Sequence, residues 1–144
     1  MPDHLRLDSA CSTLVIAIDD GTPSILHWGE ALAPDEDIPS LRAAQARPVP
    51  HAGLEHPSPI SLVADAGRGY SGYPGLAVHR GGHDFVTDLR VQTQSCTDDT
   101  ITLNLVDAQA GLAVTLIYRL DQRSDVLEIG TIVTNTGNAS LQLD

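Results

Sequence analysis

The second half of the chain alternates apolar and polar residues with a period of two, and this pattern constrains the fold more than any other feature. The alternation runs through five segments, at residues 85–95, 100–107, 112–120, 126–135 and 140–144. Between them stand short stretches rich in Asp, Asn, Gly or Ser, as hairpin loops require. Period-two alternation is typical of antiparallel strands with one buried face. The sequence therefore predicts a meander of antiparallel strands.

The first thirty residues add three more strand patterns, at residues 4–9, 12–20 and 24–32, the last two joined by a tight turn. No segment shows the apolar face of an amphipathic helix, and residues 41–45 predict one short helical turn at most. Many short strands with turns near every tenth residue are typical of a sandwich. We therefore expect an all-β fold, an antiparallel two-sheet β-sandwich.

One stretch does not fit a strand or a helix. Residues 33–59 hold six of the nine prolines, an acidic triplet and two histidines, and predict a long Pro-rich irregular loop. The 144 residues suit a single domain, 1–144, that contains this loop. The last strand pattern stops without a capping turn, and natural proteins avoid bare edge strands. We therefore expect the chain to be cut from a longer enzyme.

Composition excludes several partners. The net charge is −11 and there is no lysine, so a phosphate backbone would be repelled and nucleic acid is not an expected partner. The longest apolar run, residues 13–18, is far shorter than the roughly twenty residues of a membrane helix. The N-terminus lacks the basic and apolar regions of a secretory signal. These features predict no membrane partner and a cytoplasmic location, and the absence of lysine beside abundant Ala, Gly and Arg favours a bacterial source.

Neighbouring carboxylates recur along the chain, at Asp19 and Asp20, at residues 35–37, and at Asp98 and Asp99. A glycosidase needs two carboxyls held roughly 5–10 Å apart across a cleft. These residues instead adjoin one another at turns, where Asp forms local hydrogen bonds. We expect solvated turns and no catalytic residue.

No metal or cofactor site is expected either. Three loop histidines, His51, His56 and His83, have no matching third ligand, and no dinucleotide or phosphate-binding motif is present. Cys11 and Cys96 lack zinc-ligand spacing and are interpreted as reduced thiols, with a disulfide left open.

A glycine-rich run, GYSGYPGLAVHRGG at residues 69–82, is the strongest candidate for a contact site. Glycines let the backbone bend or approach another surface, and Tyr suits sugar faces and protein interfaces alike. The candidate contact groups in the run are Tyr70, Tyr73, His79 and Arg80. The sole tryptophan, Trp28, is a fifth candidate, although its place in a strand also favours a core anchor. A tight turn that braces its own sheet is the alternative for the run.

Three segments carry a resemblance to a known family. They are GTPSILHWGEAL at residues 21–32, YPGLAVHRGGHDFVTDLRV at 73–91, and the meander from Thr100 through the Thr-Asn-x-Gly turn that ends at Gly137. In this order they resemble the N-terminal domain of glycoside hydrolase family 36 α-galactosidases. One departure stands before Pro74, where many members carry Gly-Asp-Phe-Arg and this chain reads Tyr-Ser-Gly-Tyr.

The resemblance implies a galactose-mutarotase-like supersandwich that precedes a (β/α)8 barrel, which hydrolyses terminal α-galactosides with retention, as in melibiose or raffinose. Both catalytic aspartates of such enzymes lie on the barrel, so the resemblance implies no catalytic residue here. The implied partners are the chain's own C-terminal barrel, further copies in a homo-oligomer, and a galacto-oligosaccharide at a rim that the sandwich loops help to close.

Two other functions stay open at this point. One is a stand-alone carbohydrate-binding or mutarotase-like module, although a mutarotase needs a histidine acid and a glutamate base, and Glu128 is the only glutamate in the meander. The other is a structural or interaction domain that contacts no sugar.

Overall fold

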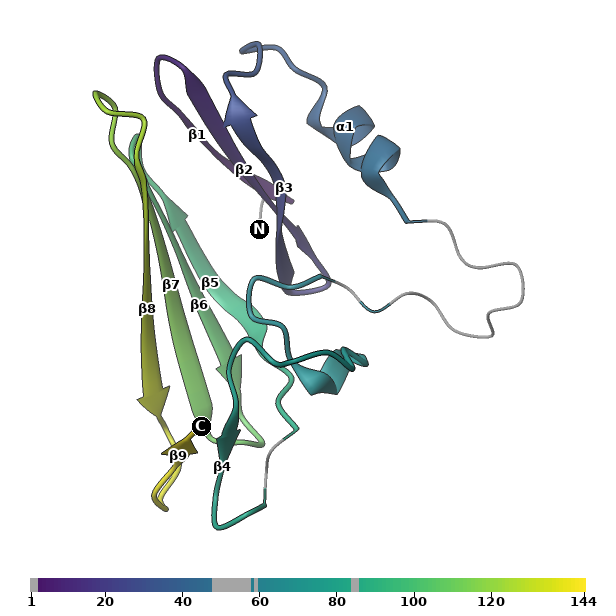
Figure 1. The fold of residues 1–144 in the computed structure, drawn as a ribbon, viewed down its shortest axis with the longest axis vertical. Coiled ribbons are helices and arrows are strands. Elements are labelled where there is room, and N and C mark those ends of the chain that lie inside the picture. The colour runs from purple at the N-terminus through teal and green to yellow at the C-terminus, as the bar shows by residue number, and fades with distance from the viewer. Residues whose placement is uncertain (1–2, 48–57, 59, 84–85) are drawn as a thin grey trace.

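Two antiparallel sheets packed face to face form the protein (Figure 1). The computed structural model describes residues 3–47, 58, 60–83 and 86–144. The first sheet has the order β1 (His4–Asp8), β2 (Ser12–Asp19), β3 (Thr22–Glu30). The second has the order β5 (Arg90–Cys96), β6 (Thr100–Asp107), β7 (Leu112–Leu120), β8 (Leu127–Asn135). A two-stranded ribbon pairs β4 (Val78–His79) with β9 (Gln142–Leu143). The predicted all-β sandwich is therefore confirmed.

The centre of the second sheet follows directly from its sequence alternation. Along β6 every second residue is buried, and β7 continues the pattern on the same face. The register pairs Leu103 with Leu116 and Leu105 with Val114, so the apolar side chains of both strands point to one side. Both strands have the bounds that the alternation predicts. In a half-buried strand every second side chain faces the core, so the apolar residues alternate with polar ones in the sequence.

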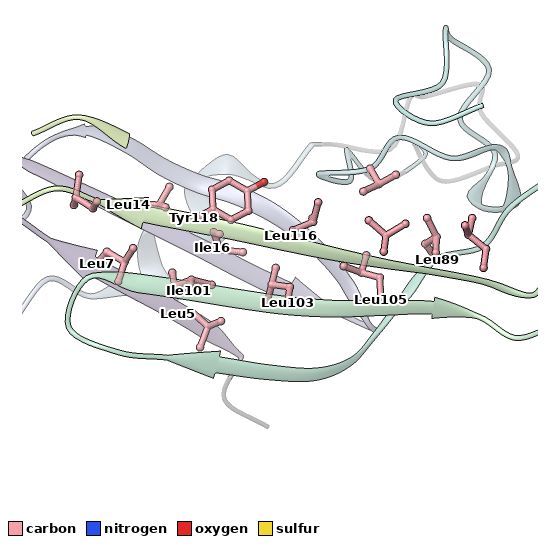
Figure 2. Packing of buried hydrophobic residues seen from close by; sticks show 14 of the residues in the cluster. Leu5, Leu7, Leu14, Ile16, Leu89, Ile101, Leu103, Leu105, Leu116 and Tyr118 are labelled. Carbon is pink, nitrogen blue, oxygen red and sulfur yellow. The ribbon is translucent and has the colours of Figure 1, made fainter. Parts of the chain in front are cut away.

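The main core lies between the two sheets. Leu7, Leu14 and Ile16 of the first sheet pack with Ile101 and Leu103 of the second, and each is at most 1% exposed. Figure 2 shows these side chains filling the space between the layers. Full burial of one such side chain contributes roughly 1.5–3 kcal/mol. Burial across the interface is thus what holds the layers together.

Loops join the two sheets at the end of the sandwich where β7 turns into β8. The Asp125 carboxylate accepts hydrogen bonds from the Ser9 hydroxyl and from the Cys11 backbone N–H, the latter at 3.1 Å. These bonds hold the pKa of Asp125 below its ordinary value. The Gln122 side chain donates to the Asp8 carbonyl at 2.8 Å. The first sheet is therefore fixed to the second by polar contacts as well as by the core.

A helix, α1 (Ile38–Gln45), lies in the stretch predicted as irregular, so that expectation is wrong for these residues. The Asp37 carboxylate accepts from the Ser40 N–H at 3.2 Å, and a proline occupies the first turn, where it costs no hydrogen bond. Ile38 packs with Val15 and Leu26 on the outer face of the first sheet. An eight-residue helix is too short to show a sustained period in the sequence. The rest of the predicted loop, residues 48–57 and 59, lies outside the described residues.

The strand predicted from residue 85 begins only at Arg90, and Phe85 lies outside the described residues. The Thr87 carbonyl accepts from the Gly67 N–H at 2.8 Å, and the Leu89 N–H donates to the Asp65 carboxylate at 2.7 Å. The backbone of residues 87–89 is therefore hydrogen-bonded to loops. The strand predicted at 140–144 is likewise reduced to the two residues of β9.

Candidate functional site at the glycine-rich loop

The glycine-rich loop is held to the body of the sandwich at two points. The Gly67 N–H donates to the Thr87 carbonyl, and the Gly75 N–H donates to the Ala64 carbonyl at 2.9 Å. A Cβ on Gly67 would lie 2.5 Å from the Thr87 oxygen, so only glycine fits there. A 3-10 turn, Ala66–Arg68, directly precedes the glycine-rich loop (residues 69–82), which lies near the ends of the second sheet where β9 is found (Figure 1). Its ends are fixed, which orients the residues between them.

The segment Thr87 to Arg90 carries a charged anchor for this loop. The Asp88 carboxylate accepts from the guanidinium of Arg68 at 2.9 Å and from that of Arg90 at 3.0 Å. Burial by itself would raise the pKa of Asp88, but the hydrogen bonds from Arg90 and Arg68 outweigh it and lower the pKa. Asp65, which is 3% exposed, has its pKa raised by burial. Asp88 is thus an ionised structural residue that ties the loop to the start of β5.

The two tyrosines of the loop differ in exposure. Tyr73 is 92% exposed, whereas Tyr70 is half-buried and folds back over the loop. A Cβ on Gly72 would lie 2.6 Å from the Tyr70 hydroxyl, so this glycine makes room for the ring. Tyr73 is therefore the loop's free aromatic group, as the contact hypothesis requires.

Arg80 is engaged with its own domain. Its guanidinium donates to the carbonyls of Ala110 and Gly111, both at 3.1 Å, and to the Asn135 side chain at 2.8 Å. It also donates to the Ala139 carbonyl. These partners lie in the β6–β7 turn, at the last residue of β8 and in the turn after it, so Arg80 joins the two turns.

His79 is also tied locally. Its Nδ1 atom accepts from the Gly82 N–H at 3.0 Å, and its Nε2 atom lies 3.6 Å from the Asp144 carboxylate. Gly81 and Gly82 both have positive φ, at 56° and 84°, as the tight turn between Arg80 and His83 demands. Two of the four candidate residues in the glycine-rich run, His79 and Arg80, thus have identified partners inside the domain.

Trp28 is not in the core, so the core-anchor reading is wrong. It lies opposite Leu14 on the inner face of β3 and is 43% exposed, because β3 is the edge strand of its sheet. Figure 1 shows that β3 ends at the opposite end of the molecule from the glycine-rich loop. The five predicted residues therefore do not form one site.

A cleft of about 580 Å³ contains two carboxylates, from Asp88 and Asp107. Both carboxylates are already engaged in hydrogen bonds within the domain. The Asp107 carboxylate accepts from the backbone N–H groups of Asp88 at 2.8 Å and Ala110 at 2.9 Å. Asp88 is bound to two arginines and has a lowered pKa, whereas a general acid needs a raised one. This cleft therefore has no free acid/base pair.

A larger groove, of about 1000 Å³, runs along the β3 edge of the first sheet, from the second sheet to the end of α1, and is called the β3-edge groove here. Its walls come from β2, β3, the end of α1, residues 60–62 and the second sheet, and include Thr22, Ile25, Ile60, Tyr118 and Ile129. Burial raises the pKa of the Tyr118 hydroxyl. Sequence reasoning missed this groove, because no local pattern shows which distant elements will face one another.

Other chemistry was sought in the described part of the chain. There, no three His, Cys, Asp or Glu side chains gather in a way that could hold a metal ion. Cys11 and Cys96 are both exposed and unbonded to each other. Among the same residues, no helix combines the length and the hydropathy that crossing a bilayer would need.

Comparison with known proteins gives the identity of the fold. Residues 21–144 match the glycosyl hydrolase family 36 N-terminal domain. The chain is 31% identical over 145 residues to an α-galactosidase of Escherichia coli. The aligned region covers 98% of this chain and 19% of that protein. This chain therefore spans about a fifth of that relative's length.

Solved structures agree on the fold. The family 36 α-galactosidase AgaA of Geobacillus stearothermophilus, determined in complex with raffinose, matches 97% of this chain and 23% of its own, with a TM-score of 0.76 and 23% identity. The galactosidase domain of the α-galactosidase–sucrose kinase AgaSK matches 96% of this chain and 23% of its own, with a TM-score of 0.74 and 18% identity. On the family match, the chain belongs to the glycosyl hydrolase family 36 N-terminal domain family.

Proposed function

We propose that the chain is the non-catalytic N-terminal domain of a parent α-galactosidase. The parent hydrolyses terminal α-D-galactosides, in oligosaccharides such as melibiose or raffinose, through a catalytic barrel outside this chain. The family match over residues 21–144 carries the proposal. The commitment of Asp88 and Asp107 to structural hydrogen bonds supports the non-catalytic role.

The domain's work in the parent is to support the barrel and the homo-oligomer, and to present loops at the active-site rim. Tyr73 is the contact group that the geometry favours, because its ring is free while Arg80 and His79 have partners within the domain. A rigid aromatic ring loses little entropy on binding and suits a protein or a sugar surface. The bacterial relatives support a bacterial source for the parent, and a cytoplasmic location stays a prediction.

The test compares the 144-residue chain with the full product of its gene on an aryl α-galactoside. We expect turnover by the full product and none by the 144-residue chain. Turnover by the short chain that a Trp28→Ala or Tyr73→Ala substitution removes would contradict the non-catalytic assignment. An inactive but folded full product would contradict the α-galactosidase assignment.

The second candidate is a stand-alone carbohydrate-binding or mutarotase-like module, which the exposed ring of Tyr73 favours. Calorimetric titration of the 144-residue chain with galactose and melibiose separates the two functions. Saturable binding that is lost in Tyr73→Ala and kept in Val126→Ala would favour the module. No binding by the short chain agrees with the first proposal.

A further inference from the structure

The end of the glycine-rich loop forms, together with His83, a tight two-residue turn. The Arg80 N–H donates to the His83 carbonyl at 2.8 Å, and the His83 N–H donates to the Arg80 carbonyl at 3.0 Å. Gly81 and Gly82 between them have φ values of 56° and 84°, as the two central residues of a type I′ turn do. These two bonds do not use the Gly82 N–H, which takes its partner from a side chain.

That partner is the imidazole ring of His79. The Gly82 N–H lies 3.0 Å from the Nδ1 atom of the ring. A backbone N–H can only donate, so Nδ1 is the acceptor and carries no proton. The neutral ring then carries its proton on Nε2, the atom that lies 3.6 Å from the Asp144 carboxylate. The turn thus selects one of the two neutral tautomers of His79.

Protonation of the ring would change these two contacts in opposite directions. An imidazolium ion donates from both nitrogens, so its Nδ1–H would face the Gly82 N–H and neither group could accept. The same ion would be attracted to the Asp144 carboxylate, because an opposite charge within about 4–6 Å favours the charged form of a group. The charged ring therefore loses its partner in the turn and gains one beside β9.

The ring lies where the turn meets the ribbon of β4 and β9 (Figure 1). His79 pairs with Gln142 of β9, and the Asp144 N–H donates to the Ala77 carbonyl at 3.1 Å. Val78, beside His79 in β4, is 2% exposed and packs in the main core. The backbone that carries the ring is therefore fixed by strand pairing and by the core.

The two glycines of the turn, in contrast, are not held by packing. A Cβ added at Gly81 or Gly82 would meet no atom of the described residues within 4 Å. The turn has two other titratable side chains. His83, which ends it, is exposed, and Arg80, which begins it, directs its guanidinium to the β6–β7 turn and to Asn135. Hydrogen bonds therefore hold the glycines in place, and the bond to His79 is the one that a proton can remove.

We propose that His79 is a pH-dependent switch for the turn at residues 80–83. The neutral ring accepts from the Gly82 N–H and holds the turn in place. The charged ring releases this amide and pairs with Asp144, so the end of the glycine-rich loop loosens as the pH falls through the range in which histidine titrates, between about 5 and 8. The inference goes beyond the proposed function and does not rest on it.

Millisecond hydrogen exchange, read by mass spectrometry with fragmentation to single residues, tests the proposal on the full product of the gene. After correction for the intrinsic effect of pH on exchange, we expect the protection of the Gly82 amide to fall about tenfold between about pH 8 and about pH 5. The amides of β6, which is paired on both sides, are the internal control. Equal protection of Gly82 at the two pH values would overturn the proposal.

Substitutions at His79 separate the roles of the two ring nitrogens. His79→Asn places an amide oxygen near the position of Nδ1 without a titratable group, so Gly82 should stay protected at both pH values. His79→Gln carries its amide near the position of Nε2 and should leave Gly82 unprotected at both. His83→Gln is the matched control and should keep the pH dependence of the unmodified protein. A loss of protection on acidification in His79→Asn, or none in His83→Gln, would refute the role of His79.

The tautomer has a readout of its own. Nitrogen-15 NMR of the histidine rings in the 144-residue chain, whose folding the same spectra verify, should show His79 with its proton on Nε2 at about pH 8. A proton on Nδ1 at that pH would contradict the hydrogen bond from Gly82 and with it the switch.

Asp144→Asn tests the partner of the charged ring. Without the carboxylate, the pH at which half of the Gly82 protection is lost should fall by about 0.5 unit, the scale of an exposed ion pair. A midpoint that stays in place would refute the pairing with Asp144. None of these readouts depends on galactoside hydrolysis, so a failure of the switch and a failure of the proposed activity are distinguishable.

Discussion

Strands β7 and β8 are neighbours in one sheet, alternate in sequence and pair in unbroken register. The side chains on their inner faces nevertheless differ in their exposure to solvent. Leu116 on β7 is 3% exposed, whereas Ile129 on β8 is 60% exposed. The two strands differ in how much of the core they meet, since β7 is buried along its inner face, whereas on β8 only Leu127 and Val133 pack against the core. Alternation therefore tells which side chains share a face, and the opposite layer decides whether that face is buried.

The largest expected effect tests this difference directly. Leu116→Ala removes a buried side chain and should lower the free energy of unfolding by about 3 kcal/mol, within the usual range for core leucines. The matched Ile129→Ala, on a mostly exposed side chain, should cost less than about 1 kcal/mol in the 144-residue chain. Urea unfolding measures both. Equal losses would show that β8 is as well packed as β7.

The next prediction concerns the hydrogen bonds that Arg80 donates near the start of β7 and the end of β8. Arg80 joins the turn before β7 to the residue that ends β8, so Arg80→Met should remove the hydrogen bonds that the guanidinium donates to the Ala110 carbonyl, while the Gly111 carbonyl keeps the N–H groups of Thr136 and Gly137. We expect a loss of about 2 kcal/mol in urea unfolding, the scale of a charged hydrogen bond. Tyr73→Ala is the control and should stay within about 0.5 kcal/mol of the parent. If Arg80→Met were as mild as Tyr73→Ala, Arg80 would be free to act as a contact residue.

Substitution of two glycines, one beside the glycine-rich loop and one on β8, should give a smaller difference in stability. Gly67→Ala would force a Cβ against the Thr87 carbonyl and should cost about 1.5 kcal/mol. On β8, a Cβ added at Gly130 would meet the Ile117 Cβ at 3.8 Å, an ordinary contact distance, so Gly130→Ala should be neutral or should stabilise by about 0.5 kcal/mol. Thermal melts of the two variants measure the contrast. A stabilising Gly67→Ala would contradict the close approach of the loop to residue 87.

The smallest effect concerns pH at the β7–β8 loop. Hydrogen bonds from the Ser9 hydroxyl and the Cys11 N–H lower the pKa of Asp125, so its contribution is complete above its ordinary value of 3.8 and is lost as pH falls through the folded-state pKa. Asp125→Asn should remove that contribution above about pH 4 and leave the stability below the folded-state pKa little changed, so the fall in stability on acidification becomes flatter. Urea midpoints between pH 2 and 7, roughly the range over which carboxylates titrate, measure this slope. An unchanged slope would show that Asp125 does not couple folding to pH.

Part of the candidate site could be found from sequence. A glycine-rich run with two tyrosines predicts an irregular segment with aromatic groups, and Tyr73 is in fact exposed. The partners of Arg80 could not be predicted, because Ala110 and Asn135 are at least thirty residues away and accept through groups with no sequence signature. Whether any of these residues contacts sugar or another subunit stays a prediction.

The sequence by itself determined the strands that are half-buried and the turns between them, because both depend on residues close together in the chain. Only the tertiary structure decided that Trp28 is half-exposed, that residues 38–45 form a helix and that Ile129 on the inner face of β8 is 60% exposed. Those outcomes depend on which layer covers which, and burial against a distant layer leaves no mark on local periodicity.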